Sequence, residues 1–342
     1  MKKILWLLLL LPFTLKAQNS SQIISKSDTS YLFGQIFSDF YFGLNDNFKP
    51  QSAFTFKQGI IGYKHTFKNK VSGLIMLDVT RTTHFKSMGD TSNNIIPVDY
   101  FEGSKYTAYL KMAEIKWNIN KHFVLRFGQL LNTQYLTFQD RFWGFRYVDV
   151  TFQEKYRFGM PADFGVQADY QLDEKLLLQV SVVNGEGPFR YQDMLSRFLY
   201  AGNVQYSPVK HFTLKLYMGL ESAPDTGVYV KSRKIASFFT GYKNKVFGIG
   251  SEANYVKDYT YEAGIDKYGF SVYGFIAVSP KFVVLARYDY LHQEFSTKDI
   301  INNYYIIGTQ YEPVRFLLTS LNFRYYSKND FPAIYLNVGF KF

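Results

Sequence analysis

Charged side chains recur at alternate positions of segments that are otherwise apolar and aromatic, such as Lys215 within 211–221 and Arg324 within 315–326. Such charges could bind and sort ions, because rings of basic side chains favour anions and rings of acidic ones favour cations. The alternation predicts six bases and six acids on one inner face. The bases are Lys57, Lys111, Arg126, Lys215, Arg287 and Arg324, and the acids are Asp39, Asp78, Asp163, Asp169, Glu252 and Asp289. Because the numbers of bases and acids are equal, an anion preference must come from local clusters of basic residues. Many single charges are expected to form ion pairs that stabilise the sheet formed by these segments.

A further group of charges lies in residues 131–161, the longest stretch between two such segments. This stretch contains the run FWGFRY at residues 142–147. Its basic residues are Arg141, Arg146, Lys155 and Arg157, and its acids are Asp140, Asp149 and Glu154. Because so many aromatic side chains are poorly accommodated in water, we expect the stretch to fold inward, to pack its rings on the wall and to narrow the interior. A structured extracellular cap is the alternative.

Signatures of catalysis are weak. The five histidines are His65, His84, His122, His211 and His292. The sequence has neither a Gly-x-Ser-x-Gly elbow nor a His-Glu-x-x-His zinc motif, although a hydrolase pair of His84 with Ser87 or Ser92 stays open. The run NGEG at 184–187 predicts a tight bend rather than a phosphate cradle, because no helix with Lys and Ser/Thr follows it. We expect no enzyme activity, no metal and no cofactor.

The alternating segments are predicted to be β-strands, and the last of them, residues 332–342, has the clearest pattern. Its apolar face carries Ile334, Leu336, Val338, Phe340 and Phe342, and its polar face carries Tyr335, Asn337, Gly339 and Lys341. Successive strand side chains point to opposite faces. An exposed strand of this kind would aggregate unless its apolar face meets lipid and its edge pairs with the first strand, which closes a barrel.

Sixteen antiparallel strands are predicted, an even number that brings both ends of the chain to the same side of the membrane. They span residues 31–43, 53–66, 71–82, 105–118, 122–130, 162–171, 176–184, 197–207, 211–221, 234–242, 246–257, 267–279, 282–292, 302–312, 315–326 and 332–342. Short connections alternate with generally longer ones, as do the periplasmic turns and extracellular loops of outer-membrane barrels. A two-sheet soluble sandwich, the alternative all-β fold, has no reason to alternate in this way. A sixteen-stranded barrel is too wide for its side chains to fill, which implies a water channel.

The amino-terminal segment has the features of a secretory signal. Lys2 and Lys3 precede an apolar run at 4–15, and cleavage is expected near Ala17. Residues 18–30 are polar and are predicted to be a flexible periplasmic leader, and residues 31–342 to be the barrel domain. No cysteine is present, so no disulfide framework is expected.

Composition agrees with a membrane barrel. The formal charge of +11 becomes +8 when the three lysines of residues 1–17, which include no acid, are removed. Basic residues are scattered among acids, so nucleic-acid binding is not expected. The excess would suit anionic solutes or lipid headgroups, and a solvated basic surface is the alternative. Aromatic residues make up 19% of the chain, which fits the aromatic girdles of membrane barrels.

Short motifs occur in a characteristic order along most of the chain. They are FKQG at 56–59, GY at 62–63, LD at 77–78, RFGQ at 126–129, WGFR at 143–146, DFGV at 163–166, VNG at 183–185 and ARYDY at 286–290. In this series the chain resembles the phosphate-selective porin O/P group of Bacteroidetes-type bacteria. The resemblance implies a sixteen-stranded channel in the outer membrane of a Gram-negative bacterium, often trimeric, with basic residues at its constriction. The chain departs from that group in lacking an obvious arginine-rich ladder.

These expectations combine into a porin for the diffusion of small polar solutes, with a preference for anions such as phosphate. Outer-membrane lipid, small polar or anionic solutes and further copies in a homotrimer are the expected partners. The residues assigned to selectivity are Arg141, Arg146, Lys155, Arg157, Lys57, Lys111, Arg126, Lys215, Arg287, Asp289 and Arg324. A non-conducting barrel that acts as a scaffold in a secretion or surface complex is the alternative, followed by an outer-membrane hydrolase.

Overall fold

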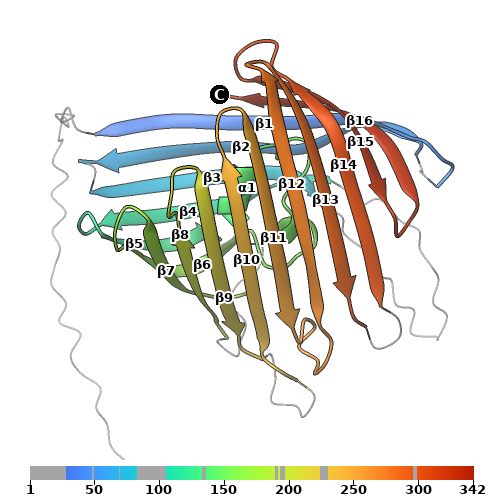
Figure 1. The fold of residues 1–342 in the computed structure, drawn as a ribbon. Helices are drawn as coiled ribbons and strands as arrows, with labels where there is room; N and C mark the ends of the chain where they lie inside the picture. The colour runs from blue at the N-terminus through green and yellow to red at the C-terminus, as the bar shows by residue number, and fades with distance from the viewer. Residues whose placement is uncertain are drawn as a thin grey trace, which may run out of the picture.

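The computed structural model describes residues 28–47, 50–68, 70–82, 105–132, 136–188, 192, 197–223, 230–295 and 299–342. Within these ranges sixteen antiparallel strands form one closed barrel (Figure 1). The predicted signal peptide, residues 18–27 of the predicted leader and the proposed hydrolase pair of His84 with Ser87 or Ser92 lie outside the described residues. The first strand begins two residues earlier than predicted, so the last part of the leader belongs to the barrel wall.

The strands follow one another around the barrel in sequence order. They are β1 Thr29–Gly43, β2 Ser52–Phe67, β3 Val71–Thr82, β4 Lys105–Asn118, β5 Phe123–Leu131, β6 Ala162–Gln171, β7 Leu176–Val183, β8 Leu199–Tyr206, β9 Phe212–Glu221, β10 Arg233–Lys243, β11 Phe247–Lys257, β12 Lys267–Ser279, β13 Phe282–Gln293, β14 Ile300–Tyr311, β15 Leu317–Tyr326 and β16 Phe331–Lys341. Every predicted strand is confirmed, with bounds that agree to within two residues.

The barrel closes between its first and last strands, as predicted. β1 and β16 pair in antiparallel register from Gln35 opposite Lys341 to Gly43 opposite Ala333. Beyond this ladder the backbones of Gly34 and Phe342 exchange two hydrogen bonds, of 2.9 and 3.0 Å. A closed ladder leaves no strand edge unpaired, which a wall in contact with lipid requires.

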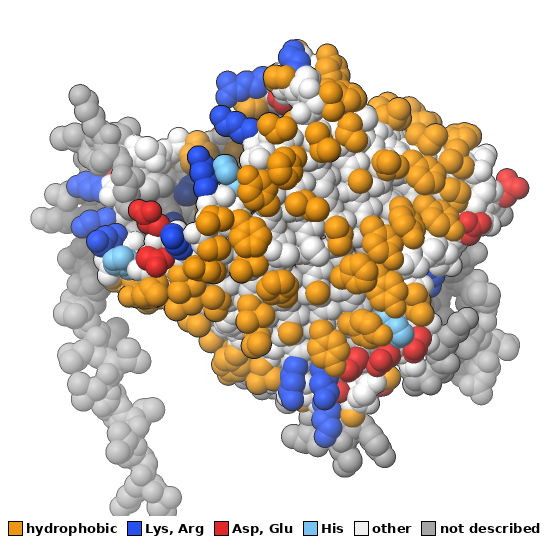
Figure 2. Space-filling view, in the orientation of Figure 1, with side chains coloured by type: hydrophobic (Ala, Val, Ile, Leu, Met, Phe, Trp, Pro, Cys, Tyr) orange, Lys and Arg blue, Asp and Glu red, His pale blue; other side chains and the backbone are white. Residues whose placement is uncertain are grey.

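The wall is apolar outside and polar inside, because its side chains alternate along each strand. On β9, Leu216 and Met218 point outward and are 42% and 59% exposed, whereas Lys215 and Tyr217 are buried on the inner face. Figure 2 shows hydrophobic side chains spread over the outer face of the strands at the front of the barrel. A soluble protein would place its apolar face in the core, so this inverted arrangement fits a wall that meets lipid.

Two β-bulges interrupt the alternation of the first four strands. Phe37 and Ser38 of β1 pair with Gln58 and Phe56, which leaves Lys57 as the extra residue of β2. In the same way, the pairing of β3 with β4 shifts between Met112 and Leu110 and leaves Lys111 as the extra residue. A bulge re-aims the side chain that it carries. The bulge in β4 therefore changes which face the alternating side chains of 105–118 occupy on its two sides.

The connection between β5 and β6 contains two short helices that the sequence pattern did not indicate. They are α1, Leu136–Trp143, and α2, Phe152–Lys155. Neither helix in the described part of the chain is long and apolar enough to cross a membrane.

Candidate functional site

Residues 136–161, which we call the α1–α2 segment, pack their aromatic side chains against inward-facing residues of the wall. Trp143, Tyr147 and Phe152 are each at most 1% exposed. The ring of Trp143 lies 5.3 Å from the ring of Tyr273 on β12. Burying aromatic rings removes large apolar areas from water. This gain explains why a connection of such composition contacts the wall.

Glycines on the inner face leave room for these rings. A Cβ atom at Gly241 of β10 would lie 2.4 Å from the ring of Phe142, and one at Gly339 of β16 would lie 3.0 Å from Tyr147. A contact of 2.4 Å cannot form without displacing a neighbour, and one of 3.0 Å is tighter than most real Cβ contacts. The two glycines therefore act as recesses for rings of the segment, on strands well apart in the barrel.

Asp149 joins the segment to the wall. Its carboxylate forms an ion pair with Lys155 of α2 and accepts a hydrogen bond of 2.8 Å from the hydroxyl of Tyr304 on β14. Its backbone oxygen accepts a hydrogen bond of 2.9 Å from the indole Nε1 of Trp143. A buried charge is stable only when it is paired and hydrogen-bonded, and these contacts meet that requirement.

Cations of three strands bind the backbone on either side of Asp149. The carbonyl oxygen of Val148 accepts hydrogen bonds from Lys57 Nζ on β2, at 2.6 Å, and from Arg324 Nη2 on β15, at 2.8 Å. The carbonyl oxygen of Val150 accepts one from Arg287 Nη1 on β13. Three residues that the sequence assigned to selectivity therefore hold the segment by its main chain.

The same cations determine the ionisation of Asp149. Burial alone would raise the pKa of this carboxyl, but the positive charges of Lys155, Lys57, Arg324 and Arg287 outweigh burial and hold the pKa well below its usual range. Nearby opposite charge favours the ionised form of an acid. Asp149 is thus a carboxylate that partly neutralises a cluster of four cations.

Two further basic residues predicted for selectivity, Lys111 and Arg126, are paired with acids of the wall. Lys111 forms an ion pair with Asp78. The Arg126 guanidinium on β5 bonds Asp169 through Nε at 2.9 Å and Glu114 through Nη1 at 3.1 Å. These pairs agree with the expectation that many inner charges brace the wall.

Arg287, Asp289 and Lys215, which the sequence also assigned to selectivity, are buried beside the α1–α2 segment. Arg287 bonds Asp289 at 2.7 Å, and both side chains are almost fully buried. Lys215, 2% exposed, donates a long hydrogen bond of 3.4 Å to the side-chain oxygen of Gln139 on α1. These groups contact the segment or each other rather than an open passage.

The opposite side of the segment carries a separate charge cluster. Arg146 bonds Asp140 at 2.8 Å through Nη1 and Glu154 at 2.6 Å through Nη2. The side chains of Arg141 and Arg157 are exposed. Of the four basic residues predicted in this stretch, two are therefore exposed, and Arg146 and Lys155 are ion-paired.

A cavity of about 390 Å³ lies on the Arg146 side of the segment, between the segment and strands β1–β4 and β16. Its lining consists of Gln35, Phe37, Ile60, Met76, Lys111, Leu131, Asp140, Arg141, Gly144, Arg146, Glu154, Pro161 and Lys341. Four of these residues are basic and two are acidic. Because Asp78 also pairs with Lys111, four bases meet three acids and the lining keeps a small positive excess, which Arg141 and Lys341 supply.

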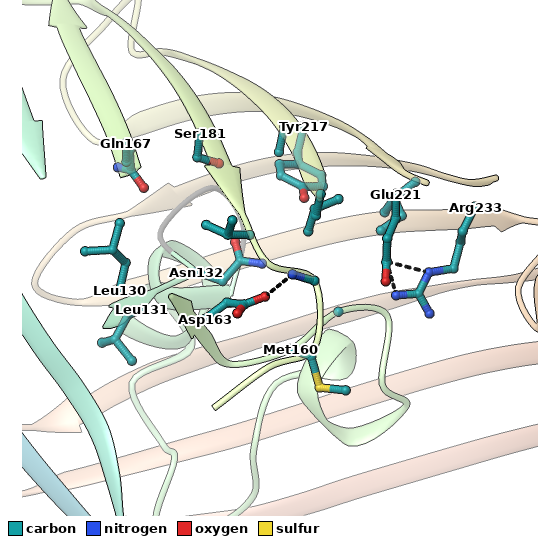
Figure 3. A pocket seen from close by; sticks show the side chains of 16 residues that line it. Leu130, Leu131, Asn132, Met160, Asp163, Gln167, Ser181, Tyr217, Glu221 and Arg233 are labelled. Carbon is teal, nitrogen blue, oxygen red and sulfur yellow. Dashed lines mark hydrogen bonds and ion pairs between the residues drawn. The ribbon is translucent and has the colours of Figure 1, made fainter. Parts of the chain in front are cut away.

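A smaller cavity of about 30 Å³ lies between the segment and strands β6–β10 (Figure 3). In it, Asp163 accepts a hydrogen bond of 2.6 Å from the backbone of Gly185, and Glu221 accepts one of 2.9 Å from Arg233. This volume holds about two water molecules. Asp163, predicted on the inner face, therefore lines this small cavity rather than the larger one.

The structure places all twelve predicted wall charges on the inner face, buried or half-buried, but does not bring them into one ring. Sequence reasoning missed Lys341 as part of the larger cavity, although it lies on the polar face of the last predicted strand. It also missed Tyr304 and Glu114, because alternation gives the face of a residue and not its partner. Among the described residues no cluster of His, Asp and Glu could hold a metal ion.

Comparison with known proteins identifies the family to which the chain belongs. Residues 159–331, half of the chain, match the profile of the family described as "Putative beta-barrel porin-2, OmpL-like". The chain belongs to this porin family. This OmpL-like porin is a barrel of the outer membrane, and its family indicates a channel rather than an enzyme. No curated protein sequence matches it.

Solved structures share the fold of this OmpL-like porin at low sequence identity. In-vitro folded OmpT of Vibrio cholerae, in its trimer form, has a TM-score of 0.61 and 13% identity, covering 92% of this chain and 100% of that one. OmpF of Salmonella typhi in complex with daunomycin has a TM-score of 0.64 and 10% identity, covering 92% and 98%. The channel DcaP of Acinetobacter baumannii has a TM-score of 0.60 and 12% identity, covering 93% and 99%.

Proposed function

We propose that this OmpL-like porin passes small polar solutes through the 390 Å³ cavity between the α1–α2 segment and strands β1–β4. In this proposal the segment folds into the lumen and narrows it, as its sequence predicts. The contacts of Trp143, Tyr147 and Asp149 with inward-facing residues support that role. A barrel of this size is too wide to be filled by its own side chains, so an inserted segment is what would restrict passage.

We further propose that the passage prefers anions. The observation that carries this proposal is the lining of the larger cavity. In it Lys111 pairs with Asp78 and Arg146 pairs with two acids, whereas Arg141 and Lys341 form no ion pair with another described residue. Basic side chains at a constriction favour anions. The resemblance to phosphate-selective porins supports phosphate-like solutes as the class.

The other predicted selectivity residues receive a different role in this proposal. Lys57, Arg287 and Arg324 hold the α1–α2 segment through the carbonyl groups on either side of Asp149. Lys155 pairs with Asp149 within the segment. They would act on selectivity through the position of the segment. Arg126 and Lys215, and Asp289 with Arg287, would brace the wall.

A planar-bilayer recording under a salt gradient tests the proposal. The double variant Arg141→Glu with Lys341→Glu should shift the reversal potential toward cation preference. Arg157→Glu is the matched control, because Arg157 is exposed on the same segment but does not line the larger cavity. Equal shifts in both variants would exclude this route. Negligible conductance of the unmodified protein would favour the scaffold alternative.

Export, orientation and assembly complete the proposal. Residues 1–17 would be removed as a signal peptide, the short turns would face the periplasm, and three copies would assemble, as in the trimer form of OmpT. Sequencing of the mature amino-terminus should give Gln18 as the first residue. Native mass spectrometry should give the mass of three chains, and a single-chain mass would contradict the trimer.

A further inference from the structure

The short connections of the barrel carry a concentrated positive charge. Seven such turns join β2 to β3, β4 to β5, β6 to β7, β8 to β9, β10 to β11, β12 to β13 and β14 to β15, and we call this side the short-turn end. The turns contain eight Lys or Arg residues and three acids. The basic residues are Lys68, Lys70, Lys121, Lys175, Lys210, Lys245, Lys281 and Arg315, and the acids are Asp173, Glu174 and Glu312.

The opposite end has the reverse balance. In the described parts of the connections there, leaving aside 132–161, eight acids accompany three bases. The acids are Asp46, Glu186, Asp258, Glu262, Asp266, Glu294, Asp299 and Asp330, and the bases are Arg197, Lys231 and Lys328. In Figure 2 basic side chains gather at the upper edge, where the turns of β10–β13 lie, whereas at the lower edge a row of acids lies beside a group of basic side chains. Among the described connections, the positive excess therefore lies at the short-turn end.

The basic side chains of the turns are exposed and are not paired with acids. All eight have exposed side chains, and none of them forms an ion pair with another residue that the structure describes. Lys281 donates a hydrogen bond of 3.1 Å to the carbonyl oxygen of Pro313 in the next turn. Most charges on the inner wall bond to other residues of the chain, whereas the charges of the turns are available to a ligand outside the chain.

Apolar side chains stand beside these charges at the tips of the turns. The exposed aliphatic residues are Ile119 at 40%, Leu172 at 50%, Val209 at 63%, Val246 at 58% and Val314 at 60%. Outward-facing aromatic residues follow at the same end of the strands, namely Phe67, Trp117, Tyr170, Tyr206, Phe247 and Tyr311. Water is an unfavourable surrounding for so much exposed apolar surface. Side chains that combine an apolar surface with a cationic head belong at the boundary of a membrane.

We propose that the short-turn end of the barrel binds anionic phospholipids. The aliphatic tips and the aromatic belt enter the apolar side of the headgroup layer, and the Lys and Arg side chains reach the phosphate groups. The combination favours lipid over a soluble polyanion, because a polyanion would neutralise the lysines but would leave the aliphatic tips in water. The inference is independent of the solute that the porin passes.

Trp117 reports directly on this surface. It is 50% exposed on the outer face near the end of β4, pairs with Val71 across the β3–β4 ladder, and precedes Asn118, whose backbone bonds the carbonyl oxygen of Lys70 at 2.7 Å. The other tryptophan of the described chain, Trp143, is 1% exposed inside the barrel and gives a constant background. Quenching of Trp117 by brominated lipid therefore measures the lipid composition beside Lys70 and Lys121.

The experiment compares the full porin in phosphatidylcholine vesicles that contain the same fraction of brominated phosphatidylglycerol or brominated phosphatidylcholine. Quenching should indicate an enrichment of the anionic lipid of about threefold or more, because one basic residue near an anionic surface contributes a preference of that order. The enrichment should fall as salt is raised. Equal quenching by the two brominated lipids would overturn the proposal.

Matched variants locate the effect. Lys68→Gln, Lys70→Gln and Lys121→Gln together remove three charges around Trp117, and the enrichment should fall toward that of the zwitterionic lipid. The control variant removes the same charge from exposed positions at the other end, through Lys231→Gln, Lys234→Gln and Lys257→Gln. The enrichment of the anionic lipid beside Trp117 should be unchanged in this variant. Enrichment that persists in the first variant, or that falls equally in both, would overturn the proposal. So would binding to peptidoglycan sacculi without any lipid enrichment.

Discussion

The hydroxyl of Tyr304 on β14 donates a hydrogen bond of 2.8 Å to the carboxylate of Asp149 on the α1–α2 segment. Lys155 pairs with the same carboxylate, and Lys57 and Arg324 bind the preceding carbonyl group. The position of the segment and the charge of the surrounding wall therefore depend on one acid. Changing that acid should alter passage and selectivity together.

Asp149→Asn tests this dependence. Breaking a buried ion pair by removing one partner costs roughly 3–5 kcal/mol, so the segment should be held less firmly. Single-channel recordings should give a larger and noisier conductance. The reversal potential should also shift toward anions, because the four cations lose their counter-charge. A purely structural loosening would change the conductance without this shift.

The matched control for that variant is Asp46→Asn, which removes the same charge from an exposed connection. It should leave both the conductance and the reversal potential unchanged. Identical recordings from Asp149→Asn and the unmodified porin would show that Asp149 does not hold the segment.

The pH dependence of docking follows from the depressed pKa of Asp149. An acid whose pKa is lowered in the folded state stabilises that state fully when the pH is above the acid's ordinary pKa, about 4 for aspartate. This stabilisation is lost only as the pH falls through the lowered pKa. For Glu154 burial opposes ionisation, but the charge and hydrogen bond of Arg146 together with Lys111 hold its pKa below the usual value. Asp149 should therefore stay ionised from pH 8 to pH 5. Conductance recorded over this range should show no pH-dependent step that can be assigned to Asp149. A midpoint near pH 6 that Asp149→Asn abolishes would contradict the argument.

Gly241→Ala tests the recess for Phe142. The added Cβ would meet the ring at 2.4 Å, and overpacking of this kind typically costs about 1–3 kcal/mol. The urea midpoint, measured by the gel mobility of the folded barrel, should fall, and the conductance should change as the ring is displaced. Gly73→Ala on β3 is the control, because a Cβ there has nothing within 4 Å. Equal effects of the two changes would exclude the recess.

A charge on the outer face should be costly in proportion to its depth. Val180 lies in the middle of β7 and is 60% exposed, and Val209 lies in a short turn and is 63% exposed. Val180→Arg should destabilise the barrel in lipid by about 2–4 kcal/mol and Val209→Arg by about 0–1 kcal/mol. Unfolding by urea in lipid vesicles measures both changes. Similar costs at the two positions would show that the outer wall does not cross a membrane.

The strands could be predicted from sequence because each one is a local pattern with a period of two. The terminal strand, with Leu336 and Val338 outward and Asn337 inward, has the predicted orientation. The pattern weakens where the backbone inserts a residue. At Lys111 a bulge changes the phase of β4, and no local signal reports an insertion that depends on the neighbouring strand.

The candidate site was less predictable for a related reason. Alternation assigned Arg287 and Arg324 to the inner face, but their partners, the carbonyl groups of Val150 and Val148, lie far away in sequence. Backbone acceptors carry no sequence signature. Basic residues that hold a segment in place and basic residues that face a solute therefore look alike until their contacts are known.

The seam of the barrel has a consequence for how the protein is made. Asn337 of β16 donates a hydrogen bond of 3.3 Å to Asp39 of β1 across 298 positions of the chain. Synthesis from the amino-terminus produces β1 first, and β16, the strand that pairs with it, is produced last. The barrel therefore cannot close before translation is nearly complete. Any fragment that ends before β16 would have two unpaired strand edges. Each N–H or C=O group without a hydrogen-bond partner there would cost several kcal/mol in hydrocarbon.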